Sequence, residues 1–165
     1  MTDLAPRSVI VGLGANVGDR FGHLEAAVSA LHDASGVRVA AVSRVYETAP
    51  LGPPQPLFLN AAARLETALP LLDLLHLTRS IEDARGRERI ERWGPRTLDI
   101  DILWAAEETV ALPDLVVPHP GLFDRAFALA PVLDVLPSPE PLFVESLAAL
   151  GGAPPLHRGT LPVPK

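Results

Sequence analysis

The chain has 165 residues, of which 48% are hydrophobic and 21% charged, a composition typical of a globular protein with a real core. We expect a single domain, 1–165. The net charge of −6 argues against sequence-independent binding of nucleic acid, which needs an excess of Lys and Arg. The absence of cysteine excludes disulfides, thiolate metal sites and a thiol nucleophile.

The sequence gives no sign of a membrane. No apolar run approaches the ~20 residues that a membrane-spanning helix needs. The first residues lack the basic start and the long apolar stretch of a signal peptide. We therefore expect a cytoplasmic protein with no membrane partner and no nucleic-acid partner, and the sequence leaves monomer and homodimer both open.

The first part of the chain predicts a strand, a helix and a second strand. Residues 8–13 form a short apolar run that ends at a glycine, which predicts a buried strand. Asp19 can cap the next helix, whose apolar residues recur at i, i+3, i+4 and i+7. The alternation over 37–46 predicts a strand, and its two faces carry Val37, Val39, Ala41 and Val45 on the core side and Arg38, Arg44 and Tyr46 on the other.

The middle of the chain predicts a loop, a strand and a helix. The stretch TAPLGPPQP holds four prolines and a glycine, which together forbid regular structure. Residues 58–66 alternate again, so Phe58 and Asn60 face away from the core. Pro70 opens a helix with one apolar stripe. The arginine-rich residues 85–96 lack apolar periodicity and predict a loop, and 97–105 predict a fourth strand.

The predicted order is therefore β-α-β-β-α-β, which is the order of a ferredoxin-like α+β sandwich. Residues 121–130 and 142–150 predict two extra C-terminal helices, and 150–165 predict an irregular tail. The proline-rich and arginine-rich segments predict long mobile loops.

Two aspartates share one face of the fourth strand. In RWGPRTLDIDILWA, alternation turns Leu98, Ile100, Ile102 and Trp104 to the core and leaves Asp99 and Asp101 on the opposite face, about 6–7 Å apart along the strand. This spacing suits one divalent cation or two neighbouring ones. The alternative is a solvated sheet face with incidental acids.

The positive charge of the chain is unevenly placed. Five arginines lie immediately before the acidic pair, at Arg85, Arg87, Arg89, Arg92 and Arg96. Guanidinium groups match phosphate oxygens bidentately, and a hard cation between carboxylates usually shares its shell with phosphates. The sequence therefore indicates a polyphosphate held by metal on one side and arginine on the other. The alternative is a solvated basic loop balanced by nearby acids.

The segment GLGANVG follows a strand and precedes a helix, as a dinucleotide-binding motif does. Its third glycine comes one position late for GxGxxG, and no βαβ crossover follows. We interpret Gly12, Gly14 and Gly18 mainly as turn glycines, with phosphate binding as the alternative.

Aromatic and histidine side chains add to the candidate site. Phe58 beside Asn60 would suit a flat heterocycle, and core packing is the alternative. His119 in VPHP is by default a structural loop histidine, and a phosphate contact is the sharper alternative.

The stretch RWGPRTLDIDI, together with ETAPLGP, FLNAAARLET and VPHPGLFDRAF, resembles the 6-hydroxymethyl-7,8-dihydropterin pyrophosphokinases of folate biosynthesis over residues 8–136. The resemblance implies the ferredoxin-like fold, and transfer of the β,γ-pyrophosphate of ATP to the pterin hydroxymethyl group with release of AMP. It also implies two Mg²⁺ ions held by Asp99 and Asp101.

The resemblance assigns further residues to the two substrates. Arg87 and Arg96 would act with the aspartates in catalysis. The residues implied around ATP are Glu82, Arg89, Arg92, Arg96, Ile102, His119 and Arg125. Those implied around the pterin are Thr48, Pro50, Leu51, Phe58, Asn60, Trp93 and Phe127, with Phe58 and Phe127 on the two faces of the ring.

The chain departs from the family pattern at four positions. Ile90 stands where relatives often carry a basic residue, and Phe58 replaces a frequent tyrosine. Pro120 follows His119 where an aromatic can occur, and Asp114 lies where a basic residue can help hold ATP. Two other functions compete with a pyrophosphokinase: a non-catalytic module that binds nucleic acid or a small ligand, and a metal-dependent phosphohydrolase or nucleotidyltransferase.

Overall fold

The computed structural model describes residues 4–87 and 93–165. The strands are β1 (Arg7–Ala15), β2 (Val37–Val42), β3 (Arg44–Thr48), β4 (Phe58–Thr67), β5 (Asp99–Ala105), β6 (Val110–Leu112), β7 (Leu115–Val117) and β8 (Leu156–Thr160). The helices are α1 (Arg20–Asp33), α2 (Leu71–Ala84), the short 3-10 helix η1 (Leu122–Asp124), α3 (Ala126–Val135) and α4 (Pro141–Ala149).

The main sheet has the order β5-β1-β4-β3-β8, with β2 also paired to β4, and its pairings are antiparallel. β1 and β4 lie at the centre of the sheet. The connection through α1 passes β4 to reach β2, and the connection through α2 passes β1 to reach β5. This arrangement confirms the predicted ferredoxin-like βαββαβ sandwich. Within the described ranges, no helix is long and apolar enough to cross a membrane.

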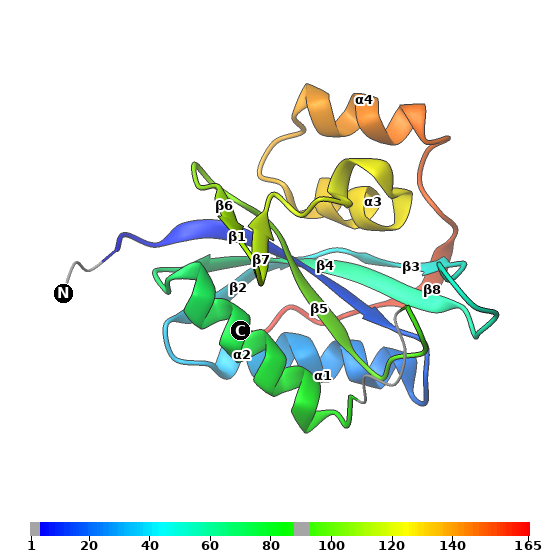
Figure 1. Ribbon diagram of the computed structural model, residues 1–165, viewed down its shortest axis with the longest axis horizontal. Coiled ribbons are helices and arrows are strands. Elements are labelled where there is room, and N and C mark those ends of the chain that lie inside the picture. Colours follow the sequence, from blue (N-terminus) through cyan, green and yellow to red (C-terminus); the bar gives the residue numbers. More distant parts are fainter. Residues whose placement is uncertain (1–3, 88–92) are drawn as a thin grey trace.

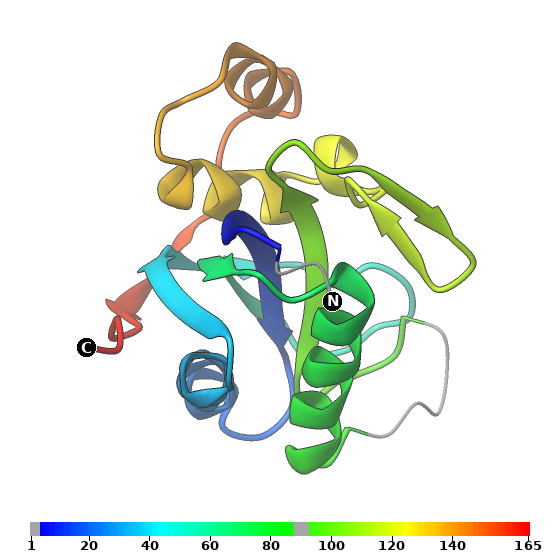
Figure 2. The same cartoon turned by 90° about the vertical axis from the view of Figure 1, so that its left-hand side faces the viewer.

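Helices cover both faces of the sheet (Figures 1 and 2): α1 and α2 lie on one face, and α3 and α4 on the other. Alternating residues of the central strands therefore enter two separate cores. Val9, Val11 and Leu13 of β1 join the cluster beneath α1 and α2, whereas Ile10 joins the cluster beneath α3. The extra C-terminal helices thus bury a sheet face that a bare βαββαβ unit leaves open.

Local sequence signals explain the crossover helices. The Asp19 carboxylate accepts a hydrogen bond of 3.0 Å from the Gly22 N–H and caps α1. A Cβ atom on Gly22 would lie 2.2 Å from the Asp19 carboxylate, so a larger residue there would displace this side chain from its present position. On α2 the predicted apolar stripe is buried, and it continues to Glu82, which is 3% exposed.

Two bulges overturn parts of the predicted alternation. The register of β2 on β4 shifts between Val39 and Ala41, so Ala41 packs against the α3 cluster and not the core predicted for it. The register of β5 on β1 shifts as well, and Trp104 joins Leu103 in the α3 cluster, not Ile100 and Ile102 in the α1 and α2 cluster. In each case one extra residue reverses the faces that follow it.

Other parts of the prediction also need correction. The strand predicted over 37–46 is broken at Ser43 into β2 and β3, and Tyr46 is only 1% exposed because α3 covers its face. The helix predicted over 121–130 is instead η1 followed by α3, which continues to Val135. The prediction of an irregular tail is wrong at β8, because this strand pairs with β3. The β6–β7 hairpin was not predicted.

Candidate active site

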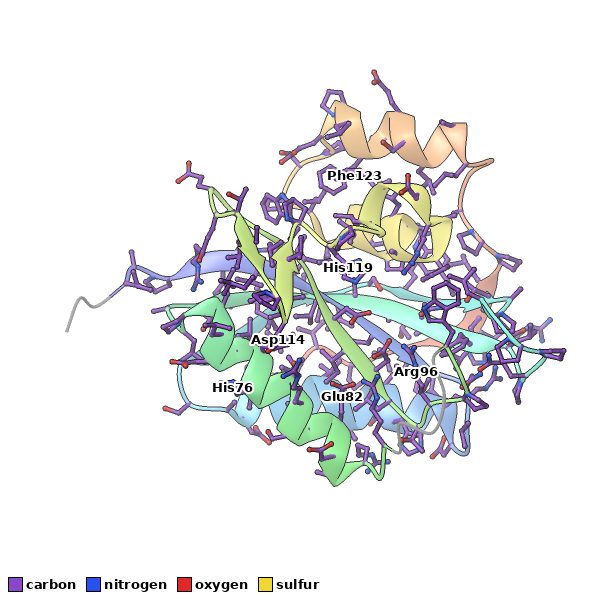
Figure 3. All side chains as sticks on the ribbon, in the orientation of Figure 1. His76, Glu82, Arg96, Asp114, His119 and Phe123 are labelled. Atoms are coloured by element: carbon purple, nitrogen blue, oxygen red, sulfur yellow. The ribbon has the colours of Figure 1, made fainter. Side chains whose placement is uncertain are left out.

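A cleft of about 460 Å³ opens beside β5, and it contains most of the residues singled out from the sequence. Its floor comes from β1, β4 and β5, one wall from α2, and the opposite wall from the start of α3 and the loop after β3. Figure 3 shows Glu82, Arg96 and His119 along the length of β5, with Glu82 reaching from α2 and His119 from the loop after β7.

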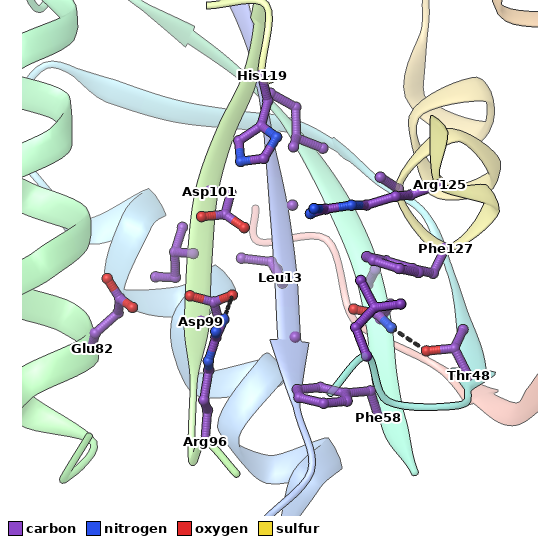
Figure 4. Close-up of a pocket in the computed structure, with 18 of the residues that line it drawn as sticks. Leu13, Thr48, Phe58, Glu82, Arg96, Asp99, Asp101, His119, Arg125 and Phe127 are labelled. Carbon is purple, nitrogen blue, oxygen red and sulfur yellow. Dashed lines mark hydrogen bonds and ion pairs between the residues drawn. The ribbon is translucent and has the colours of Figure 1, made fainter. Parts of the chain in front are cut away.

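The acidic pair points into this cleft, as the alternation of β5 predicts. Asp99 and Asp101 are half-buried, and their partners on the neighbouring strand β1 are Gly14 and Gly12 respectively. Because glycine has no side chain, no group from β1 covers the two carboxylates. Figure 4 shows both aspartates facing the open space.

Gly12 and Gly14 therefore correct the prediction of turn glycines, since both lie inside β1. A Cβ atom on Gly12 would lie 3.0 Å from the Leu103 side chain, and one on Gly14 would lie 3.0 Å from Asn60 Oδ1. Gly18 alone of these three has a positive φ, at 71°, and it fits the predicted turn. Because Gly12 and Gly14 have no side chains, the cleft is not filled from β1 at these two positions.

Two arginines hold Asp99. The Arg87 guanidinium donates to Asp99 Oδ1 at 2.8 Å, and Arg96 donates to Asp99 Oδ2 at 2.6 Å. Arg87 also forms an ion pair with the buried Glu82. Charge-assisted hydrogen bonds of this length are strong, so the start and the end of the arginine-rich segment are both tied to β5.

Asp101 lies in a different electrostatic environment. Burial, together with the charge of Asp99, raises the pKa of Asp101 to about 7, although Arg96, Arg87 and Arg125 oppose the shift. A carboxyl group in such a position gains stability from a proton or from a cation. Among the described residues, no group of three or more His, Cys, Asp or Glu could hold a metal ion.

His119 and Arg125 line the end of the cleft near α3. His119 Nδ1 accepts a hydrogen bond of 3.0 Å from the Gly121 N–H, which leaves Nε2 to carry the proton of the neutral ring. Burial and the charge of Arg125 lower the pKa of His119. A Cβ atom on Gly121 would lie 2.6 Å from the Arg125 guanidinium carbon, so glycine allows that group to lie close to the backbone.

The other half of the cleft is aromatic and carries little charge. Phe58 on β4 and Phe127 on α3 face the same space (Figure 4). Between them Asn60 Nδ2 donates to Thr48 Oγ1 at 2.6 Å. This bond fixes the amide so that Asn60 Oδ1 remains an acceptor toward the cleft, and a flat heterocycle would fit this geometry.

The structure brings most of the predicted residues together, with some exceptions. Arg89 and Arg92, and the departure at Ile90, lie outside the described residues. Pro50 and Ile102 are not among the residues that line the cleft, and Ile102 is 4% exposed in the core. Asp114, noted as a departure from the family pattern, lies at the edge of the cleft.

Sequence reasoning missed Arg79 and did not recognise that Gly12 and Gly14 line the cleft. Leu75, Arg79 and Glu82 lie on one stripe of α2, so the spacing i, i+4, i+7 could have identified Arg79. Gly12 and Gly14 are two residues apart, as are Asp99 and Asp101. This shared spacing could have indicated that the two glycines lie beside the two aspartates on the neighbouring strand.

Paired carboxylates next to converging guanidinium groups are typical of enzymes that transfer phosphate-containing groups. The facing phenylalanine rings and the fixed amide add an acceptor site for a flat ring. The cleft thus has the features of a transferase of phosphate-containing groups, beside a space that would fit a flat ring.

Comparisons with known proteins specify the family. Residues 10–137 match the model of 7,8-dihydro-6-hydroxymethylpterin-pyrophosphokinase (HPPK). The chain is 45% identical over 126 residues to 2-amino-4-hydroxy-6-hydroxymethyldihydropteridine pyrophosphokinase of Bacillus subtilis, covering 76% of this chain and 75% of that protein. The enzyme of the same name from Pseudomonas aeruginosa is 45% identical over 130 residues, which cover 78% of this chain and 80% of that protein.

The chain belongs to the HPPK family, whose members transfer pyrophosphate from ATP to hydroxymethyldihydropterin in folate synthesis. It is also 40% identical to the mitochondrial folate synthesis bifunctional protein of Arabidopsis thaliana, covering 79% of this chain and 24% of that protein. The HPPK-DHPS crystal structure from Plasmodium falciparum has the same fold, with a TM-score of 0.70 at 13% identity, covering 91% of this chain and 46% of that chain.

Proposed function

We propose that the chain transfers the β,γ-pyrophosphate of ATP to 6-hydroxymethyl-7,8-dihydropterin in a magnesium-dependent reaction that yields the pterin diphosphate and AMP. The observation that carries this proposal is the half-buried pair Asp99 and Asp101, which faces the cleft beside two strand glycines and next to Arg87 and Arg96. Family membership supports the pterin as acceptor.

The carboxylate pair fits Mg²⁺, with two ions as the expected number. Magnesium is usually held by one or two carboxylates and by substrate phosphates rather than by a cage of protein ligands. Asp99 and Asp101 supply such an incomplete set, and the raised pKa of Asp101 is consistent with a position that favours an added positive charge. When bound, Mg²⁺ would neutralise phosphate charge and polarise the group that is transferred.

The arginines would hold and neutralise the triphosphate. Arg87 and Arg96 already converge on Asp99, and both can turn from that carboxylate to phosphate oxygens. His119 and Arg125 would bind phosphate from the other end of β5, with the Nε2 proton of neutral His119 available as a donor. Arg89 and Arg92, outside the described residues, are proposed to add phosphate contacts.

The nucleoside would lie toward α2. Glu82 and Ile102 are the residues proposed from the sequence, and Leu75 and Arg79 line the same wall as Glu82. The pterin would lie at the opposite end, between Phe58 and Phe127. Asn60 would read the ring edge, with backbone groups of Thr48, Pro50 and Leu51 beside it and Trp93 over the opening.

Positioning and charge neutralisation can account for most of the rate enhancement that these residues provide. Phosphoryl transfer needs little covalent help from the protein, because the hydroxyl must only be aligned with the phosphorus and the leaving group. The rings of Phe58 and Phe127 would orient the acceptor, and Arg96 would follow the charge that develops in the transition state.

The test is AMP formation with purified protein, ATP, Mg²⁺ and the pterin, each omitted in turn. The proposal expects AMP only when all three are present. AMP formed without pterin would indicate a hydrolase, and binding of both ligands without AMP would indicate a non-catalytic module. The single-domain organisation, the cytoplasmic location, the absence of a nucleic-acid partner and the oligomeric state stay predictions.

A further inference from the structure

Asn16 is a buried polar residue that the reaction scheme leaves without a role. It follows β1, its exposed fraction is 2%, and its backbone N–H donates to the Arg96 carbonyl at 3.1 Å. Its side-chain Oδ1 accepts from the Arg96 N–H at 2.9 Å. Asn16 therefore pairs with both backbone groups of the residue whose guanidinium reaches Asp99.

The amide nitrogen of Asn16 contacts a second segment. Asn16 Nδ2 donates to Gln55 Oε1 at 2.8 Å and to the Pro56 carbonyl at 2.9 Å. Both acceptors belong to the proline-rich loop between β3 and β4, hereafter the pterin loop (49–57). A single buried amide thus uses its donors on the pterin loop and its acceptor on the phosphate-binding segment.

Gln55 completes a second link between the same two segments. Its Nε2 donates to the Trp93 carbonyl at 2.8 Å and to the Pro53 carbonyl at 3.2 Å. Trp93 has a φ of 58°, an uncommon value for a residue with a side chain, which must be stabilised by its surroundings. Gly52 lies against it, and a Cβ atom there would be 3.0 Å from the Trp93 Cβ.

We propose that Asn16 and Gln55 are positioning residues that lock the pterin loop to the Trp93–Arg96 segment, so that order in one half of the cleft is transmitted to the other. The physical reason is that the pterin loop has no helix or strand of its own, and Gln55 joins it to the Trp93 carbonyl by a hydrogen bond. Neither residue touches the acidic pair, so each acts through Trp93 and Arg96. This inference rests on the proposed function of the cleft.

The coupling is measured without turnover. Pterin affinity is titrated with and without a saturating, non-hydrolysable ATP analogue and Mg²⁺, and the ratio of the two dissociation constants is the coupling factor. We expect a factor above one for the unaltered chain and a decrease of at least ~5-fold in Gln55→Met, which keeps the side-chain length but cannot make the hydrogen bonds to Asn16, Pro53 and Trp93. Turnover at saturating substrates should fall ~10-fold in the same variant because Arg96 is less well placed.

Tryptophan fluorescence gives a readout that a loss of stability alone would not change. The chain has two tryptophans, so in a Trp104→Phe background emission comes from Trp93 alone. Adding the ATP analogue with Mg²⁺ and then the pterin should change this emission in two steps, and Gln55→Met should remove the second step. Asn16→Ala removes three hydrogen bonds from a buried position and leaves their partners unpaired, so Gln55→Met is the variant that decides.

A matched control is Thr67→Val. Thr67 is 1% exposed, and its Oγ1 donates to the Gly36 carbonyl at 2.6 Å and accepts from the Leu69 N–H at 3.0 Å, away from the cleft. This variant should lower the melting temperature and leave the coupling factor unchanged. A coupling factor of one in the unaltered chain, or an unaltered factor in Gln55→Met, would overturn the inference. AMP formation by the unaltered chain would still support the proposed function in that case.

Discussion

The two halves of the cleft are built in different ways. On the pterin side, Phe58 and Phe127 project from β4 and α3, and Asn60 is fixed by Thr48. On the phosphate side, Arg87 and Arg96 lie outside helices and strands, and both bind an acid of the protein itself. The aromatic half is formed by packing, whereas the charged half is held by internal ion pairs.

This difference has a consequence for ligand binding. A flat ring entering the aromatic half would meet no salt bridge of the described residues, although the Arg125 guanidinium lies 5.9 Å from the centre of the Phe127 ring. Phosphates entering the charged half must exchange with Asp99 for the guanidinium groups, and an added cation must replace the arginines at that carboxylate. Substitutions on the charged side should therefore change turnover, and those on the aromatic side should change pterin affinity.

The largest effect is expected for Asp101→Asn. Removing one carboxylate of the pair should lower turnover at least ~100-fold, because neutralisation of phosphate charge is central to the reaction. The same change removes a charge that burial and Asp99 disfavour, so the melting temperature above pH 7 should hold or rise. Steady-state AMP formation and thermal unfolding measure the two quantities.

Asp33→Asn at the exposed end of α1 is the matched control and should be close to the unaltered chain in both assays. Near-normal AMP formation by Asp101→Asn would contradict the metal-binding role. A large drop in melting temperature would instead indicate that Asp101 is a structural residue.

The second prediction concerns Arg96→Ala. Its guanidinium holds Asp99 in the free protein and is proposed to move to the developing charge, so turnover should fall ~100-fold while the KM for ATP changes by less than ~5-fold. The exposed Arg38→Ala on β2 controls for loss of positive charge. A loss of ATP affinity with unchanged turnover would make Arg96 a ground-state anchor.

The third prediction tests the aromatic half. Phe127→Leu keeps apolar volume but removes the ring face, so the KM for the pterin should rise ~10-fold and the KM for ATP should stay near its original value. Phe127→Trp restores a ring face and should recover part of the affinity. Equal changes in both KM values would show that the two halves of the cleft are not separable in this way.

The sequence predicted the fold and the acidic pair because both depend on short-range periodicity. Alternation on β5 correctly turned Asp99 and Asp101 away from Ile100, and the stripe on α2 correctly placed Leu74 in the core. Bulges could not be predicted, because the extra residue is defined only by the partner strand, and Ala41 and Trp104 were misplaced for that reason. The pairing of β8 with β3 joins segments far apart in the chain and leaves no local signal.

The contacts of Asn16 escaped prediction on similar grounds. Its partners Gln55 and Arg96 lie 39 and 80 residues away along the chain, and neither has a periodic relation to it. By contrast, Phe58 could be assigned to the pterin only through the family resemblance, since an aromatic ring on a strand is equally compatible with core packing, and Phe127 was singled out by the resemblance alone. Side-chain geometry adds the fixed Asn60 amide between them.

The smallest effect is expected at the back of the aromatic half, where a network of Arg44, Tyr46 and Asp134 joins α3 to the sheet. Asp134 on α3 accepts a hydrogen bond of 2.8 Å from the Tyr46 hydroxyl. It also forms an ion pair with Arg44 at 2.8 Å. Burial, followed by this hydrogen bond, raises the pKa of Tyr46 from 10.0 to about 12. Because the folded pKa exceeds the unfolded one, the contribution of the Tyr46 hydroxyl to stability is complete below pH 10 and is lost as the pH rises toward 12.

Tyr46→Phe should therefore lower the free energy of unfolding by about 1–2 kcal/mol at pH 8. Between pH 10 and 12, the free energy of unfolding should fall less steeply in this variant, because it has no Tyr46 hydroxyl to ionise. Denaturant unfolding at a series of pH values measures both. Since α3 carries Phe127, the KM for the pterin should rise by less than ~3-fold, well below the effect of Phe127→Leu. An equal rise in the two variants would mean that the position of α3, rather than the ring of Phe127, determines pterin affinity.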